Sequence, residues 1–244
     1  MEDIIFGRGP VGEALKSDRE KDKLLIKKGA YSHAMVPIIE AAKKRGIVLQ
    51  QTETAKLDKL AGGGNHQGVI AMVSAYSYVT VRDILERARD RGESPFVIIC
   101  DRITDPHNLG AVIRTANCVG ASGVIIPKRG SAGVNSVVMK TSVGAAEYTP
   151  VAKVTNIAQT IEELQREGLW ITAADMNGES MYDIDFKGAI GIVVGSEGSG
   201  ISRLVREKCD FVASIPMRGE INSLNASVAA AVLMYEALRQ RGIK

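Results

Sequence analysis

The sequence predicts an α/β fold in two parts: a small N-terminal α/β domain over residues 1–76 and a larger domain with a parallel sheet over residues 95–244. Three observations carry this prediction. From residue 95 onward, short continuous apolar runs alternate with helical segments, which is typical of a parallel sheet covered on both faces. Residues 77–94 are charged and helix-like but lack an apolar face suited to a core, so we expect a linker there. With 244 residues, 45% of them apolar, the chain can form one large core or two small ones.

The first 76 residues show short strands and helices in alternation. Strands are predicted at 23–27, 48–52 and 68–76, and helices at 32–45, which Ser32 would cap, and at 54–60. The stretch GGGNHQG at 62–68 is a polar, glycine-rich loop. It could contact RNA, and it could equally be a plain turn.

The second domain shows six strand-like runs separated by helical segments. The strands are predicted at 96–100, 123–126, 151–154, 170–174, 190–194 and 211–215. The helices are predicted at 109–119, 136–146, 157–167 and 202–208, with a long final helix that opens at 222–225.

Charge and composition limit the classes of function that this chain can have. The formal net charge of +3 lies entirely in residues 1–76, which hold 12 Lys and Arg against 9 Asp and Glu, whereas residues 77–244 hold 19 of each. A nucleic acid would be attracted to that excess, although a solvated helix end explains it equally well. No run of about 18 apolar residues predicts a membrane span, and the first residues lack a signal-peptide pattern.

Cysteine and histidine spacing bears on location and on metal binding. The three cysteines, Cys100, Cys118 and Cys209, are far apart and odd in number, so we expect reduced thiols and a cytoplasmic location. The three histidines are also widely separated, which gives no support for a metal site.

The common nucleotide-binding motifs are missing, but polar segments follow three of the predicted strands. No GxxxxGK[ST] or GxGxxG motif occurs in the expected place. After the strand at 96–100, Asn108 and Arg114 lie at the start and on one face of the next helix. Arg114 could meet an anionic partner or form a surface salt bridge, and Asn108 could simply cap the helix.

The other two segments follow the strands at 190–194 and 211–215. The first holds Gly195, Gly198 and Gly200 around Glu197, and it could bring backbone close to a ligand or be a tight turn. The second ends in NSLN at 222–225, more polar than one helix cap requires. Because open α/β sheets bind ligands at the carboxyl ends of their strands, we expect the three segments to line one pocket.

These segments, in this order, resemble a known family. NLGAVIRTA at 108–116, VVGSEGSGIS at 193–202 and IPMRGEINSLNASVAAAVLMYEA at 215–237 resemble the three motifs of the SpoU/TrmH group of RNA ribose 2′-O-methyltransferases, within the SPOUT superfamily. The N-terminal part, from IIFGRGPVGEAL to GNHQGVIAMVSAY, is similar to the substrate-binding domain of the bacterial enzyme that methylates a guanosine ribose in 23S rRNA.

The resemblance implies a specific fold and cofactor. The second domain would be a SPOUT domain with a deep trefoil knot, a feature that is very rare in proteins. The knot would be built from residues 195–202 and 215–225, and the N-terminal domain would be ribosomal protein L30e-like and bind RNA. S-adenosylmethionine would lie in the knot, and the protein would be a homodimer. Cofactor contacts are expected from Ala173, Gly195, Gly198, Ile215, Met217 and Leu224.

The resemblance also implies the reaction, transfer of a methyl group to a ribose 2′-oxygen of rRNA. The catalytic residues are expected to be Asn108, Arg114, Glu197, Ser223 and Asn225. In the family the arginine is proposed as the base, but a guanidinium is hard to deprotonate. Arg114 would therefore stabilise the developing alkoxide or grip a phosphate while the other residues orient the ribose. The same reaction on tRNA is an alternative, and a non-catalytic ribosome-assembly factor is a weaker one.

Overall fold

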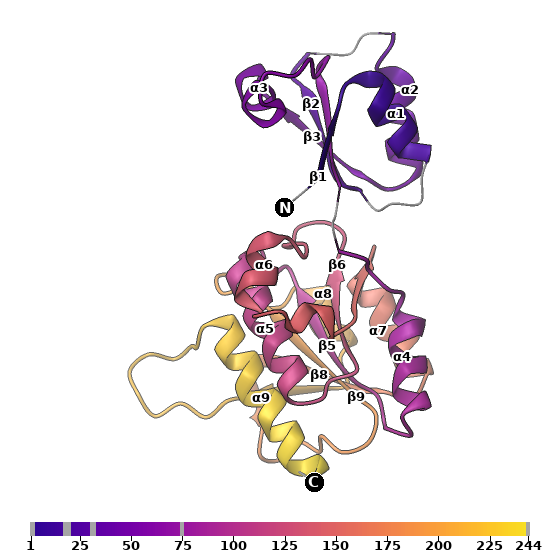
Figure 1. Cartoon of the computed structure of the whole chain (residues 1–244). Coiled ribbons are helices and arrows are strands. Elements are labelled where there is room, and N and C mark those ends of the chain that lie inside the picture. The colour runs from indigo at the N-terminus through magenta and orange to yellow at the C-terminus, as the bar shows by residue number, and fades with distance from the viewer. Residues whose placement is uncertain (1–2, 17–20, 30–32, 74–75, 243–244) are drawn as a thin grey trace. The chain divides into compact units, whose positions relative to one another are not determined.

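The computed structural model describes residues 3–16, 21–29, 33–73 and 76–242 and divides into two compact units, Met1–Ser77 and Tyr78–Lys244 (Figure 1). Each unit has its own sheet and its own hydrophobic core. Both are of the α/β class that the sequence predicts. Ser32, expected to cap a helix, lies outside the described residues.

The first unit is a four-stranded mixed sheet with helices on both faces. Its elements are β1 (Asp3–Phe6), α1 (Arg8–Lys16), β2 (Lys21–Lys27), α2 (Val36–Lys44), β3 (Val48–Thr52), α3 (Thr54–Ala61) and β4 (Val69–Val73). The strand order is β1-β4-β2-β3, in which only β2 and β3 are parallel. Because side chains alternate along a strand, Leu24 and Ile26 pack under α1 and α2, whereas Leu25 packs under α3.

The second unit is a six-stranded parallel sheet covered by helices. Its elements are α4 (Val81–Asp90), β5 (Phe96–Asp101), α5 (Pro106–Cys118), β6 (Gly123–Pro127), α6 (Ser136–Thr141), β7 (Val151–Val154), α7 (Ile157–Arg166), β8 (Trp170–Ser180), β9 (Ile190–Gly195), α8 (Arg203–Lys208), β10 (Phe211–Ser214) and α9 (Ala226–Arg241). The strand order is β10-β8-β9-β5-β6-β7. Helices α4, α7 and α8 cover one core, while α5 packs against α6 and α9 (Figure 1). Within the described residues, no helix has the length and apolar character needed to cross a membrane.

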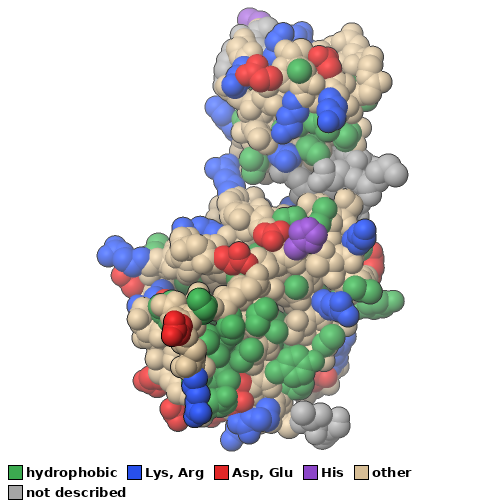
Figure 2. Space-filling model, turned by 90° about the vertical axis from the view of Figure 1, so that its left-hand side faces the viewer, with side chains coloured by type: hydrophobic (Ala, Val, Ile, Leu, Met, Phe, Trp, Pro, Cys, Tyr) green, Lys and Arg blue, Asp and Glu red, His purple; other side chains and the backbone are tan. Residues whose placement is uncertain are grey.

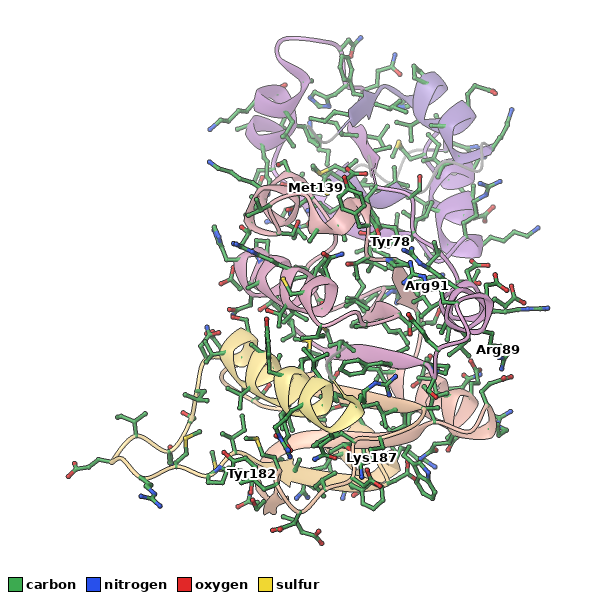
Figure 3. The ribbon with its side chains drawn as sticks, turned by 60° about the horizontal axis from the view of Figure 1, so that its bottom comes forward. Tyr78, Arg89, Arg91, Met139, Tyr182 and Lys187 are labelled. Carbon is green, nitrogen blue, oxygen red and sulfur yellow. The ribbon has the colours of Figure 1, made fainter. Side chains whose placement is uncertain are left out.

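The predicted linker at 77–94 is wrong for residues 81–90, which form α4. Thr80 and Asp83 make a reciprocal capping box at its start, and Ile84 is fully buried in the core of the second unit. Arg89, labelled in Figure 3, donates from Nη2 to Glu167 Oε2 at 2.6 Å. The many charged side chains of α4 lie on the face turned to solvent. The opposite face carries only a narrow stripe of apolar side chains, which is enough to bury that face against the core.

Several other elements differ from prediction, among them α2, which begins at Val36, and β8, which continues to Ser180. The helix expected at 136–146 ends at Thr141, because Val143 and Gly144 both take positive φ angles, 52° and 81°. The final helix begins at Ala226 rather than at 222–225. The elements β1 and α1 were not predicted, since Gly7, Gly9 and Pro10 obscure the pattern there.

Candidate active site

A cavity of about 590 Å³ lies at the carboxyl ends of strands of the parallel sheet. Strands β8 and β10 pair in register up to Ala173 and Val212, and the next pair joins Glu179 to Ala213. Residues 174–178 therefore leave the ladder and form one wall. Two other walls come from the loop after β9 and the segment after β10. The lining residues are Ala174, Asp175, Met176, Asn177, Val194, Gly195, Ser196, Glu197, Gly198, Ser199, Gly200, Ala213, Ile215, Met217, Asn222, Ser223, Leu224, Ala226 and Ala229.

The loop after β9 folds back tightly on itself. Ser196 N donates to Gly200 O at 3.2 Å, and Gly200 N donates to Ser196 O at 2.9 Å. A Cβ atom at Gly195 would lie 2.2 Å from the backbone carbon of Gly200, which no real side chain tolerates. Glycine at position 195 is therefore required for the loop to close, and the closed loop presents Glu197 at its tip.

Three of the predicted catalytic residues, Asn108, Glu197 and Asn225, are joined by hydrogen bonds. Asn108 Nδ2, at the start of α5, donates to Glu197 Oε1 at 2.8 Å. Asn225 Nδ2 donates to Asn108 Oδ1 at 3.0 Å and also to Glu197 Oε1. Segments separated by 89 and 117 residues in the chain thus converge in one hydrogen-bonded cluster, which we call the Asn–Glu–Asn cluster.

Besides its hydrogen bonds within the Asn–Glu–Asn cluster, Asn225 also caps α9. Its Oδ1 accepts from the backbone N–H of Ser227 at 2.8 Å and of Val228 at 3.3 Å, which caps α9. The alternative that Asn108 simply caps α5 is wrong, because Asp105 caps this helix by accepting from His107 N at 2.9 Å. The side chain of Asn108, which is 7% exposed, therefore makes its hydrogen bonds within the Asn–Glu–Asn cluster instead of capping α5.

The segment between β10 and α9 leaves the body of the unit and returns at the start of α9 (Figures 1 and 3). Residues 217–225 are all exposed, including Met217 and Leu224 at 38% each. Its two ends line the cavity, through Ile215 and Met217 on one side and residues 222–224 on the other. The segment therefore borders the cavity while its middle lies in solvent.

Two carboxylates that the sequence did not single out support the site. Asp101, 4% exposed at the end of β5, accepts from Ser202 N at 2.6 Å and fixes the far end of the loop after β9. Asp175 lines the cavity, accepts from Asn177 N at 2.9 Å and faces Arg206 Nε at 3.4 Å. Their position directly after predicted strands was the available signal.

The remaining predicted residues divide into two groups. The cavity is lined by Gly195, Gly198, Ile215, Met217, Ser223 and Leu224. Four predicted residues do not line it: Asn108 and Asn225, which reach it through their hydrogen bonds to Glu197, and Ala173 and Arg114. Ala173 is fully buried in the core of the unit, and its neighbour Ala174 faces the cavity instead. Arg114 is exposed, and the structure shows it no hydrogen bond or ion pair with a described residue.

The site is built without a metal-like cluster. The described parts of the chain hold no group of three His, Cys, Asp or Glu side chains placed to bind a metal ion. Burial raises the pKa of the Cys209 thiol to about 12, so this cysteine is a poor nucleophile at neutral pH. The polar groups that line the cavity are amides, hydroxyls, exposed backbone and the carboxylates of Asp175 and Glu197.

Family models match both units. Residues 4–79 match a model described as RNA 2′-O ribose methyltransferase substrate binding, and residues 95–235 match the SpoU rRNA Methylase family. Over 240 residues the chain is 45% identical to YacO of Bacillus subtilis, whose name places it in the TrmH family of tRNA/rRNA methyltransferases; the match spans 98% of this chain and 96% of YacO.

Solved structures show the same relationship. The SpoU methyltransferase AviRb of Streptomyces viridochromogenes, in complex with AdoMet, matches with a TM-score of 0.60 and 25% identity over 98% of this chain and 90% of that one. The TrmH/SpoU tRNA modifying enzyme of A. aeolicus matches with a TM-score of 0.56 and 28% identity, over 65% of this chain and 79% of that one.

Proposed function

The chain belongs to the SpoU/TrmH family of RNA methyltransferases, and from that membership we propose that it methylates the ribose 2′-oxygen of a guanosine in 23S rRNA with S-adenosylmethionine as donor. The observation that carries the proposal is that two of the three segments that resemble the family's motifs line one cavity, and the third is hydrogen-bonded to both of them. Asn108, Glu197 and Asn225, one from each segment, form the Asn–Glu–Asn cluster at the edge of that cavity.

The cavity fits the proposed cofactor. Its volume of about 590 Å³ is in the usual range for a small-molecule site. Glycines at 195, 198 and 200 leave backbone groups accessible, and Ile215, Met217 and Leu224 offer apolar contact to a nucleoside. We propose that these residues hold S-adenosylmethionine, which supplies a methyl group on a positively charged sulfur. We also propose that residues 195–202 and 215–225 form the trefoil knot.

Methyl transfer requires a ribose 2′-hydroxyl that is held in line with the methyl group of the donor and that loses its proton. Glu197 is the carboxylate of the Asn–Glu–Asn cluster, and both of its amide partners donate to it. We propose that the cluster orients the ribose, with Ser223 beside it on the cavity wall. Asparagine and serine side chains cannot take up a proton at neutral pH, so they can position the hydroxyl but cannot act as its base.

Arg114 does not reach the cavity of its own chain. It lies six residues beyond Asn108 on α5, about 9 Å along the axis and on another face of the helix. We propose a homodimer in which Arg114 of each chain stabilises the developing alkoxide in the other chain's site. Exposed apolar side chains support such a contact: Val228 is 46% exposed, Tyr235 is 53% exposed, and Figure 2 shows hydrophobic side chains gathered on the face where α9 lies.

Mixing two impaired variants tests this arrangement. If Arg114 acts across the dimer, a heterodimer of Arg114→Ala and Asn225→Asp has one complete site and is more active than either variant alone. If Arg114 acts within its own chain, neither site is complete and the mixture is no more active than the two variants alone.

The first unit favours rRNA over tRNA as the substrate. It matches a substrate-binding family model over residues 4–79, whereas the match to the A. aeolicus tRNA modifying enzyme spans only 65% of this chain. The test is to incubate the protein with S-adenosylmethionine labelled in its methyl group and total RNA from a strain that lacks the protein. The RNA is then separated by class. Label in 23S rRNA supports the proposal, whereas label only in tRNA, or in no RNA, contradicts it.

A further inference from the structure

The first unit carries a groove of about 470 Å³ between α1 and α2 that the proposed chemistry does not use. Figure 1 shows the two helices side by side on one face of the sheet. The floor of the groove is apolar and includes Leu15 and Ile38. Of the described residues that line it, four are cationic and one is acidic: Arg8, Lys16, Lys44 and Arg45 against Glu13.

Two glycines on α1 have no role in the fold of this unit. Gly9 and Gly12 lie within the helix, where glycine is less favourable than alanine. Neither has a positive φ angle, and a Cβ atom at either would meet nothing within 4 Å. Gly7, just before the helix, differs, because its φ angle of 92° requires glycine. Gly9 and Gly12 instead keep the wall of the groove open on the side of α1.

Three of the cations around the groove, Arg8, Lys16 and Lys44, make few contacts, whereas Arg45 donates from Nη2 to Lys16 O at 3.1 Å. The structure gives Lys44 no ion pair with a described residue. Lys16 pairs with Glu13 at 2.8 Å, but both side chains are about three-quarters exposed, and such surface pairs contribute little. Arg8 donates from Nε to Gln67 O at 3.2 Å, which leaves its terminal nitrogens pointing to no described partner.

We propose that this groove binds the phosphodiester backbone of the substrate RNA. The eight-residue advance from Arg8 to Lys16 covers about 12 Å of α1, longer than the spacing of successive phosphates, so the groove would contact more than one nucleotide. The missing side chains at Gly9 and Gly12 would let the sugar–phosphate chain approach the helix. This inference rests on the proposed function, because it adds a contact to the same RNA substrate.

The test measures RNA binding by the full-length protein as a function of salt, using fluorescence anisotropy with a labelled single-stranded RNA oligonucleotide. Losing one phosphate contact lowers the slope of log K against log [salt] by about 0.7, which is about fivefold in affinity between 1 M and 0.1 M salt. We expect that loss for Lys44→Ala. The matched control is Lys56→Ala, an exposed lysine on α3 that does not line the groove, and it should keep the wild-type slope.

A second variant tests the groove through its shape. In Gly12→Leu the added Cβ would meet nothing within 4 Å and the rest of the side chain would lie over the groove, so RNA affinity should fall while Tm stays at or above that of the wild type. Wild-type slopes and affinities for both groove variants would overturn the proposal. If the groove variants lost binding to poly-glutamate but bound RNA like the wild type, the proposal would also be overturned, and the groove would be assigned to an acidic protein partner.

The outcome is separable from that of the proposed function. If the wild type methylates RNA and the groove variants bind RNA normally, the groove proposal fails and the function stands. If the wild type neither binds S-adenosylmethionine nor labels any RNA, the function fails whatever the groove variants do.

Discussion

Replacing Asn225 separates its two tasks, because its oxygen caps α9 while its amide nitrogen serves the Asn–Glu–Asn cluster. Asn225→Ala removes both. Asn225→Asp keeps an oxygen that can accept from the N–H groups of Ser227 and Val228, but it has no donor and places a carboxylate beside Glu197. The two variants should therefore differ in stability and agree in activity.

The magnitudes follow from the contacts. Loss of an asparagine cap costs about 1 kcal/mol, so Asn225→Ala should unfold at lower denaturant while Asn225→Asp stays within about 0.5 kcal/mol of the wild type. Hydrogen bonds to a charged group contribute about 1.5–3 kcal/mol. If they position the ribose, both variants should lose about 10- to 150-fold in kcat/KM for methyl transfer.

The assay pairs urea unfolding with labelled methyl transfer to RNA. Asn156→Ala is the matched control, because Asn156 caps α7 by accepting from Gln159 N at 3.2 Å and does not line the cavity. It should lose stability like Asn225→Ala and keep its activity. Wild-type kcat/KM in Asn225→Asp would refute the reasoning, as would activity losses that simply follow stability in all three variants.

Three further predictions concern the cavity loop, the last helix and a buried thiol. Gly195→Ala should lower the free energy of unfolding by about 1–3 kcal/mol and abolish S-adenosylmethionine binding in calorimetry, because its Cβ would meet backbone at 2.2 Å; Gly198→Ala meets nothing within 4 Å and should fold normally, so a loss of binding in it would mark a direct cofactor contact. A hydrogen bond from Arg239 lowers the pKa of the buried Glu236, so its stabilisation is present above the usual carboxyl pKa and lost as pH falls through the lowered one; the Tm difference between wild type and Glu236→Gln should be full at neutral pH and shrink as the pH falls through that range. Cys209, whose pKa burial raises to about 12, should resist iodoacetamide at pH 8 in the native protein and react in urea, as mass spectrometry of its peptide would show; fast labelling of the native protein would contradict its burial.

The parallel sheet could be predicted because its strands are buried on both faces. The runs at 96–100 and 190–194 are apolar at every position, and their strands are buried almost throughout. The helical character of residues 77–94 was predicted, but the packing of α4 in the second unit was missed, because its charges hide a narrow buried stripe of Ile84, Leu85 and Ala88. The capping pair Thr80 and Asp83 was the local signal for a well-formed helix rather than a linker.

The site was predictable in its parts but not in its geometry. The sequence points to Asn108, Glu197 and Asn225, and the structure brings them into one hydrogen-bonded cluster. Which side chain faces the cavity depends on strand register, which composition does not determine; Ala173 was expected there and Ala174 lines it. The exposed position of Arg114 also depends on the face that α5 turns to its neighbours.

The most direct test of ribose methylation is the identity of the product nucleoside. RNA labelled by the wild-type protein and methyl-labelled S-adenosylmethionine would be digested to nucleosides and analysed by liquid chromatography and mass spectrometry. The proposed function predicts that the label is in 2′-O-methylguanosine from 23S rRNA, and that Asn225→Asp forms it about 10- to 150-fold more slowly. Label on a nucleobase would contradict the proposal that the cavity delivers its methyl group to a ribose oxygen.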